Sequence, residues 1–85
     1  MNYITYCLYS LESDKIYIGY TSNLIERFKS HNILSTKGYT VNFRPWMVAY
    51  VEFSNIKMEA QKREKQLKSS RGRDFLRNYI RENYE

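Results

Sequence analysis

The spacing of apolar and polar residues predicts a β-hairpin at the start of the chain. Residues 3–11 are rich in β-branched and aromatic side chains, which is typical of a strand. The polar residues 12–14 interrupt this pattern, and a second short strand is predicted over residues 15–20. Because so short a connection joins neighbouring antiparallel strands, the two runs should pair as a hairpin.

Helical and extended patterns alternate through the rest of the chain. The further predicted elements are a helix over residues 24–31, a loop over 32–44, a strand over 46–53, and helices over 55–69 and 73–84. No repeat, low-complexity tract or linker interrupts this order of β-β-α-β-α-α, so we expect one domain over residues 1–85. The predicted fold class is α+β, with helices flanking a three-stranded antiparallel sheet.

One polar residue breaks the apolar stripe of the predicted 55–69 helix. Ile56, Ala60 and Leu67 mark the side that should face the core, and Glu64 falls among them at helical spacing. A carboxylate that points into a core costs free energy unless another group pairs with it or binds it. Glu64 is therefore expected to have a partner, either a bound cation or a neighbouring basic side chain.

Composition and charge narrow the kinds of partner that such a domain would bind. The chain has 85 residues, a net charge of +5 and nine tyrosines. Excess positive charge favours a polyanion such as DNA. Cys7 is the sole cysteine, which excludes an internal disulfide and a cysteine-based zinc site, and we expect it in the core. No apolar run reaches membrane-spanning length and no secretory leader is recognisable, so a cytoplasmic protein without membrane contact is expected.

Two tyrosines, an arginine and a histidine in the first half of the chain supply further candidate chemistry. Tyr6 and Tyr17 stand on the two hairpin strands, and Arg27 and His31 are one helical turn apart. Tyrosine and histidine can transfer protons, and a guanidinium matches the geometry of a phosphate. A single carboxylate such as Glu64 is enough for Mg²⁺, which keeps several of its waters. Together these five residues predict a small metal-assisted phosphodiesterase site.

The register of the hairpin decides whether Tyr6 and Tyr17 share a face. They do so when the numbers of paired residues add to an odd value, which a two- or four-residue loop provides. Gly19, inside the second strand, indicates either a bulge or a place where another group approaches the backbone closely.

Basic residues surround Glu64 along the chain and form a candidate surface for the phosphates of a bound strand. They are Lys62, Arg63, Lys65, Lys68, Arg71 and Arg73. Each candidate residue also has an ordinary structural explanation when it is taken alone. A tyrosine on a strand usually packs in the core, and a charge run is usually solvated. Glu64 would pair with Arg63, Lys65 or Lys68 if its helix were rotated.

The order of motifs along the chain resembles the GIY-YIG nuclease superfamily. The matching segments are YCLYS, KIYIGYTSNLIERFKSHN, RPWMVAYVEF and AQKREKQLK. More closely, the chain resembles the small stand-alone bacterial members that are related to the N-terminal nuclease domain of the DNA-repair excinuclease. The second signature triplet, Tyr17-Ile18-Gly19, is intact, whereas Ile4 stands in place of the glycine of the first triplet.

The resemblance implies a role for each residue of the candidate site. Tyr6 and Tyr17 would be catalytic, and Arg27 and His31 would assist at the phosphate. Glu64 would hold one Mg²⁺ or Mn²⁺. Tyr6 is the preferred general base, with Tyr17 or a metal-bound hydroxide as the alternatives.

The function expected is that of a metal-dependent DNA endonuclease of low sequence specificity, acting in DNA repair or processing. A non-catalytic nucleic-acid-binding module on the same scaffold is the first alternative, and a small protein–protein adaptor is the second. A chain of this size has little room for a separate recognition module. A second copy or a partner chain would therefore supply further specificity.

Overall fold

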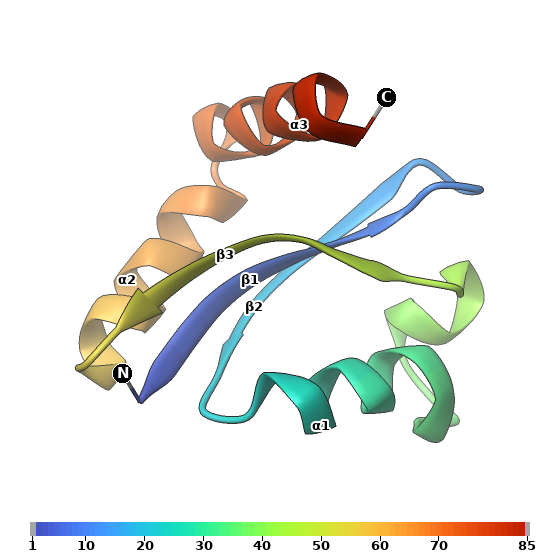
Figure 1. The fold of residues 1–85 in the computed structure, drawn as a ribbon, viewed down its shortest axis with the longest axis horizontal. Coiled ribbons are helices and arrows are strands. Elements are labelled where there is room, and N and C mark those ends of the chain that lie inside the picture. The colour runs from blue at the N-terminus through green and yellow to red at the C-terminus, as the bar shows by residue number, and fades with distance from the viewer. Residues whose placement is uncertain (1, 85) are drawn as a thin grey trace.

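The computed structural model describes residues 2–84 and contains a three-stranded antiparallel sheet with helices on both faces (Figure 1). The elements are β1 (Tyr3–Ser10), β2 (Lys15–Thr21), α1 (Leu24–Lys29), β3 (Met47–Ser54), α2 (Lys57–Lys68) and α3 (Ser70–Tyr84). β1 is the central strand, and β2 and β3 form the two edges. None of the helices within residues 2–84 is long and apolar enough to cross a membrane. The predicted α+β fold and the order of its elements are confirmed.

The hairpin between β1 and β2 places Tyr6 and Tyr17 on the same face of the sheet. Tyr6 pairs with Gly19 and Leu8 pairs with Tyr17, so the paired numbers add to an odd value as predicted. The loop spans residues 11–14. Asp14 closes it with a φ of 52°, in the left-handed region that aspartate tolerates better than most residues.

The sheet separates two hydrophobic clusters, one on each face. α2 and α3 cover the first, whose buried members are Cys7, Tyr9, Ile16, Ile18, Ala49, Leu67, Leu76 and Ile80. α1 and the short 3-10 helix η2 (Tyr39–Phe43) cover the second, whose buried members are Tyr6, Leu8 and Trp46. Leu24 and Phe28 of α1 pack against this second cluster. The expected burial of Cys7 is also confirmed.

Two short helical turns occupy much of the segment that was predicted to be a loop over residues 32–44. α1 continues into the π-helical turn η1 (Ser30–Leu34), and η2 follows directly after Gly38. The prediction of an irregular segment is wrong because hydrogen bonds between residues six to fourteen positions apart hold these turns. Periodicity does not record such contacts.

The two C-terminal helices begin at different residues from those predicted. α2 begins at Lys57, so Ile56 is its N-cap and is 56% exposed instead of facing the core. α3 begins at Ser70, where the Ser69 hydroxyl accepts a hydrogen bond from the backbone N–H of Gly72 at 3.2 Å. A Cβ at position 72 would lie 2.4 Å from the Cα of Leu67. Glycine is therefore what lets α3 start so close to α2.

Candidate active site

A buried chain of hydrogen bonds runs through His31 on the α1 face of the sheet. The Tyr6 hydroxyl lies 3.0 Å from Nε2 of His31, and the Thr40 hydroxyl lies 3.1 Å from Nδ1. Tyr6, Thr40 and His31 are 1%, 5% and 8% exposed. The indole N–H of Trp46 donates to the Thr40 carbonyl at 2.8 Å, which holds Thr40 in place. Both ring nitrogens of His31 therefore have a partner from a different element.

The π-helical turn η1 carries His31, and a single arginine satisfies the carbonyl groups of that turn. Arg44 donates to the carbonyl oxygens of His31 at 2.7 Å, Ser30 at 3.2 Å and Ser35 at 2.7 Å. The end of a helix leaves such carbonyls without intrahelical partners, so Arg44 stabilises the turn that positions His31. Sequence analysis missed both Arg44 and Thr40, because their contacts with His31 cross a segment that has no periodicity.

Electrostatics keep Tyr6 and His31 neutral near pH 7. Burial raises the pKa of Tyr6 to about 12, and Tyr17 and Glu64 act in the same direction, whereas Arg27 opposes the rise. Burial also lowers the pKa of His31, and the positive charges of Arg27 and Arg44 lower it further. A neutral phenol therefore faces a neutral imidazole.

Gly19 makes room for Tyr6 at the edge of the sheet. A Cβ at position 19 would lie 2.6 Å from the Tyr6 hydroxyl oxygen, which is closer than real contacts allow. The prediction that Gly19 marks a close approach is confirmed. Because β2 is an edge strand, the Tyr6 hydroxyl passes over this glycine toward the rim of the sheet.

Tyr17 and Arg27 complete the α1-face group around His31. The ring centroids of Tyr17 and His31 are 4.6 Å apart. Tyr17, Arg27 and His31 line one cavity together with Tyr39 of η2, and the Arg27 side chain is exposed. Four of the five residues singled out from the sequence therefore gather on one face of the sheet.

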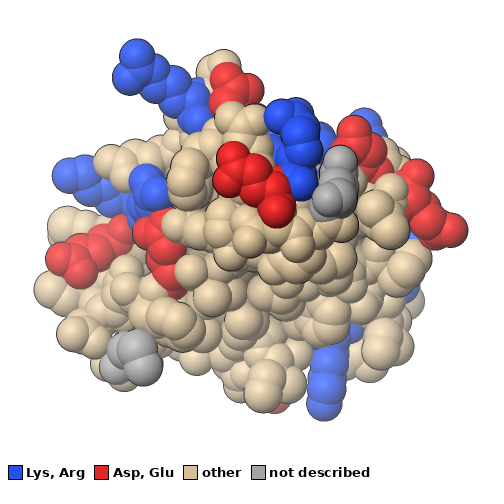
Figure 2. All heavy atoms as spheres, turned by 45° about the horizontal axis from the view of Figure 1, so that its top comes forward, with Lys and Arg blue, Asp and Glu red and all other residues tan. Residues whose placement is uncertain are grey.

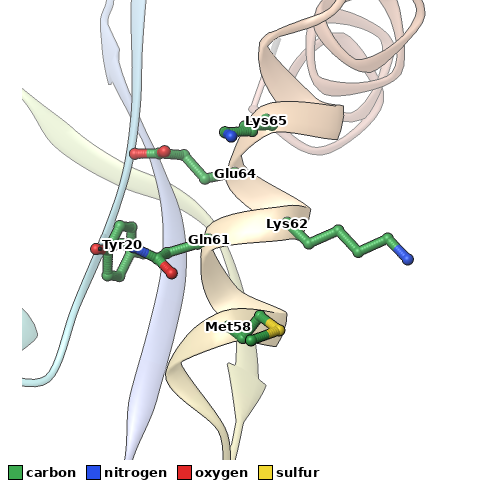
Figure 3. A pocket seen from close by; sticks show the side chains of 6 residues that line it. All are labelled: Tyr20, Met58, Gln61, Lys62, Glu64 and Lys65. Carbon is green, nitrogen blue, oxygen red and sulfur yellow. Dashed lines mark hydrogen bonds between the residues drawn. The ribbon is translucent and has the colours of Figure 1, made fainter.

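Glu64, the fifth residue, approaches from α2 on the opposite face. Figure 3 shows its carboxylate extending from α2 toward β2, beside Gln61 and Tyr20. These residues line a cavity of about 310 Å³. The side chain is 19% exposed, and its carboxylate lies 3.5 Å from Nζ of Lys68. The expectation of a carboxylate inside the core is wrong, because the carboxylate lies at the rim of the buried stripe. Its negative charge is nevertheless one of the causes that raise the pKa of Tyr6.

Comparison with known proteins identifies the family. The profile of the GIY-YIG catalytic domain matches residues 2–79. The chain belongs to the GIY-YIG family. It is 40% identical over 68 residues to a UPF0213 protein of Clostridium perfringens (strain 13 / Type A), and the aligned region covers 80% of this chain and 71% of that protein. It is 34% identical over 67 residues to a UPF0213 protein of Staphylococcus haemolyticus (strain JCSC1435), covering 79% of this chain and 77% of the relative. No solved structure gives a significant match.

The donor set of this GIY-YIG domain fits a hydrated cation better than a caged one. Within residues 2–84, no group of three or more His, Cys, Asp or Glu side chains could hold a metal ion. Mg²⁺ commonly binds through one or two carboxylates and retains several waters. Glu64, which opens into a cavity, fits that mode of binding.

The basic residues near Glu64 do not share one environment. Arg63 donates from Nε to both carboxylate oxygens of Glu52 at 2.9 Å, and Lys68 pairs with Glu64. Lys62, Lys65, Arg71 and Arg73 are exposed, and Lys62 and Lys65 line the cavity beside Glu64. Figure 2, in which α3 is turned forward, shows basic side chains interleaved with acidic ones. The visible face therefore carries no continuous basic stripe.

Proposed function

We propose that this GIY-YIG domain is a divalent-metal-dependent DNA endonuclease that hydrolyses phosphodiester bonds with low sequence specificity. The observation that carries the proposal is the 3.0 Å contact between the Tyr6 hydroxyl and Nε2 of His31, inside a buried polar chain. Burying polar groups costs free energy unless they are paired, so a buried series of hydrogen bonds needs every one of its members. Its member His31 lines a cavity together with Tyr17 and Arg27.

Arg27 has the position and charge to bind the phosphate. Its guanidinium is exposed beside Tyr17 and His31, and its positive charge lowers the pKa of both Tyr6 and His31. A planar guanidinium matches two phosphate oxygens at once. Arg27 would hold the phosphate on the α1 face and neutralise the charge that develops on it.

Burial favours Tyr17 over Tyr6 as the general base, acting directly or through a water. Tyr6 is 1% exposed and its pKa is raised to about 12, so removing its proton costs more free energy than it does for an ordinary phenol. Tyr17 is only partly buried, and its side chain lines the cavity that Arg27 and His31 share. Tyr6 would then act chiefly by orienting His31.

The hydrogen-bond chain favours one tautomer of His31. Arg27 lowers the pKa of Tyr6, as a donor to the phenol oxygen does, and a guanidinium has no acceptor for the phenol proton. The Tyr6 hydroxyl would therefore donate to Nε2 of His31. Nδ1 would carry the imidazole proton and donate to the Thr40 hydroxyl.

Glu64 would hold one Mg²⁺ or Mn²⁺ at the rim of β2. A bound ion of this kind supplies neutralisation of charge on the phosphate and on the leaving oxygen. Lys68 would release the carboxylate readily, because a half-exposed ion pair of this kind contributes little free energy. DNA repair or processing, a cytoplasmic location, and a second copy or partner chain that adds specificity belong to the same proposal.

A cleavage assay tests this function. End-labelled single-stranded, duplex and branched DNA is incubated with the protein in Mg²⁺, in Mn²⁺ and in EDTA. An Arg27→Met preparation made in parallel controls for contaminating nuclease, since Arg27 is exposed and its loss should not affect folding. We expect cleavage with either metal, none in EDTA, and a large loss in the Arg27 variant. Binding without cleavage of any of the three DNAs would instead identify a non-catalytic nucleic-acid-binding module.

A further inference from the structure

A second feature of the α1 face lies beside the His31 hydrogen-bond chain. It is a cavity of about 260 Å³, formed by β2, α1, η1, η2 and the segment between the two turns. Its walls include Tyr17, Arg27 and His31, together with Lys37 and Tyr39. We call it the Tyr39 cavity. Because it shares three residues with the proposed catalytic group, any group that fills it lies next to the phosphate held there.

Tyr39 provides an ordered and accessible aromatic ring at this cavity. The residue is 49% exposed, although other rings pack around it. Its ring centroid lies 4.9 Å from that of Phe43, 6.4 Å from that of Trp46, and 6.4 Å from that of Tyr17 at an interplanar angle of 26°. These contacts restrain the ring before any ligand binds, which lowers the entropic cost of binding.

The segment before Tyr39 contributes a glycine and a positive charge to the lining of the cavity. Gly38 has a φ of 105°, and no atom lies within 4 Å of the position that its Cβ would occupy. A side chain at this position would be strained and would extend into open space. Lys37 and Arg27 supply two cations beside the aromatic wall. Aromatic rings next to cations are the combination that binds single-stranded nucleic acids, through base stacking and phosphate contacts.

The geometry of duplex DNA determines which of its chemical groups could occupy the Tyr39 cavity. A base within a duplex is stacked on both faces, so it can offer a face to Tyr39 only after it leaves the stack. An unpaired base is free of that cost. The competing occupant is the sugar–phosphate backbone of a duplex, which needs Lys37 and Arg27 but not the ring of Tyr39.

We propose that the Tyr39 cavity binds one unpaired nucleobase by stacking on Tyr39. The position of the cavity beside Arg27 and His31 would then make the enzyme select unpaired nucleotides at the cleavage site. The statement about cleavage rests on the proposed nuclease function, whereas base binding does not depend on it.

Binding measured without turnover tests the inference. The affinity of a labelled oligothymidylate, of an all-abasic strand of equal length, and of a duplex is measured by fluorescence anisotropy in EDTA. Tyr39→Leu removes the ring, Tyr39→Phe keeps it, and Phe53→Leu is the matched control at an exposed aromatic residue on β3. Thermal unfolding followed by circular dichroism checks that each variant is folded.

The expected result is a coupling between the ring and the base. Tyr39→Leu should weaken oligothymidylate binding by about 5- to 100-fold, while Tyr39→Phe and Phe53→Leu stay close to the unaltered protein. The abasic strand should bind the unaltered protein more weakly by a similar factor, and Tyr39→Leu should not weaken it further. If Tyr39→Leu does not fold, the comparison of the two strands on the unaltered protein and on Tyr39→Phe still decides.

Three outcomes would overturn the inference. One is equal binding of the abasic strand and oligothymidylate, and another is a Tyr39→Leu effect of equal size on all three DNAs, because neither result depends on an unpaired base. The third is unchanged binding by Tyr39→Leu, which would assign the cavity to the backbone. Because the assay contains no metal, a protein that stacks bases but does not cleave DNA would refute the nuclease function and leave the cavity assignment intact. A protein that cleaves DNA but binds it equally well without the Tyr39 ring would refute the cavity assignment and leave the nuclease function intact.

Discussion

The two halves of the proposed site are held in place in different ways. On the α1 face, His31 is fixed at both ring nitrogens by the Tyr6 and Thr40 hydroxyls, and all three side chains are buried. On the α2 face, Glu64 is partly exposed at the rim of a cavity and pairs with the half-exposed Lys68. The first half is preorganised before substrate binds, as a group that stabilises developing charge should be. In the second half, a metal ion can take the place of the Lys68 ammonium group beside Glu64.

This difference predicts separate consequences for stability and for activity. Removing a member of the buried chain should reduce both, because it leaves a buried polar atom without a partner. Removing the partly exposed carboxylate should reduce activity alone. The predictions below test this contrast, beginning with the largest expected effect.

Glu64→Gln should lower the rate of cleavage by about 10³- to 10⁴-fold, because the protein ligand of the metal is lost. The free energy of unfolding should change by less than about 0.5 kcal/mol, since only a partly exposed i,i+4 ion pair disappears. Urea unfolding and cleavage assays measure the two quantities. Glu59→Gln is the matched control, because Glu59 carries the same charge on an exposed position of α2. A stability loss of several kcal/mol in Glu64→Gln would make Glu64 a structural ion-pair partner.

Tyr6→Phe should lower both activity and stability. The cleavage rate should fall by about 10²-fold, as for a group that takes part in orienting or transferring a proton. The free energy of unfolding should fall by about 1–3 kcal/mol, because Nε2 of His31 loses its partner in a buried position. Tyr17→Phe is the contrasting variant, with a loss of rate at least as large and little change in stability. Loss of rate in Tyr6→Phe alone, with Tyr17→Phe active, would return the general-base role to Tyr6.

Part of this contrast could be predicted from the sequence. Alternation of apolar residues and a short loop predicted the hairpin, and the odd register placed Tyr6 and Tyr17 on one face. The position of Glu64 was predicted less well, because Ile56 is the N-cap of α2 and not a member of its buried stripe. Helical periodicity places residues within an element but does not tell where that element begins.

The supporting residues around His31 could not be predicted in this way. Thr40 reaches His31 from nine positions away, and Arg44 reaches the His31 carbonyl from thirteen. Both lie in a polar segment whose sequence pattern does not indicate the two short helical turns that it forms. Only the folded chain brings their hydroxyl and guanidinium groups to the imidazole. The buried half of the site therefore depends on long-range packing that no local pattern records.

Thr40→Val should change the tautomer of His31 and lower the rate of cleavage by about 3- to 10-fold, the worth of one hydrogen bond. Valine keeps the shape of threonine but removes the acceptor for Nδ1–H. His31 is the sole histidine, so its imidazole ¹⁵N shifts can be read without overlap. Thr40→Ser retains the hydroxyl and should keep both the tautomer and the rate. Unchanged ¹⁵N shifts in Thr40→Val would show that Thr40 does not select the tautomer.

The stability of the protein should fall as the pH drops below the ordinary histidine pKa of about 6.5. The pKa of His31 is lowered by burial and by Arg27 and Arg44, so the unfolded chain binds this proton more tightly than the folded chain does. Stability therefore rises with pH from the folded pKa up to the unfolded value, and this contribution is complete above it. Urea unfolding at about pH 5.5 and about pH 7.5 measures the change. His31→Gln should remove most of this pH-dependent change in the free energy of unfolding. An equal change in that variant would assign the pH dependence of stability to other groups.

The smallest effect concerns the basic residues that flank Glu64, where one helix carries two kinds of cation. Lys65 is exposed beside the Glu64 cavity, whereas Arg63 is held by the carboxylate of Glu52 on β3. If Lys65 contacts a phosphate, Lys65→Gln should reduce the slope of log affinity against log salt by about 1 and leave stability unchanged. Arg63→Gln should leave the slope unchanged and lower the melting temperature, because Glu52 keeps the Tyr50 hydroxyl but loses the guanidinium that helps to hold its pKa low. Equal slopes for Lys65→Gln and the unaltered protein would exclude this part of α2 from the DNA interface, and the electrostatic contact would then lie on the α1 face with Arg27 and Lys37.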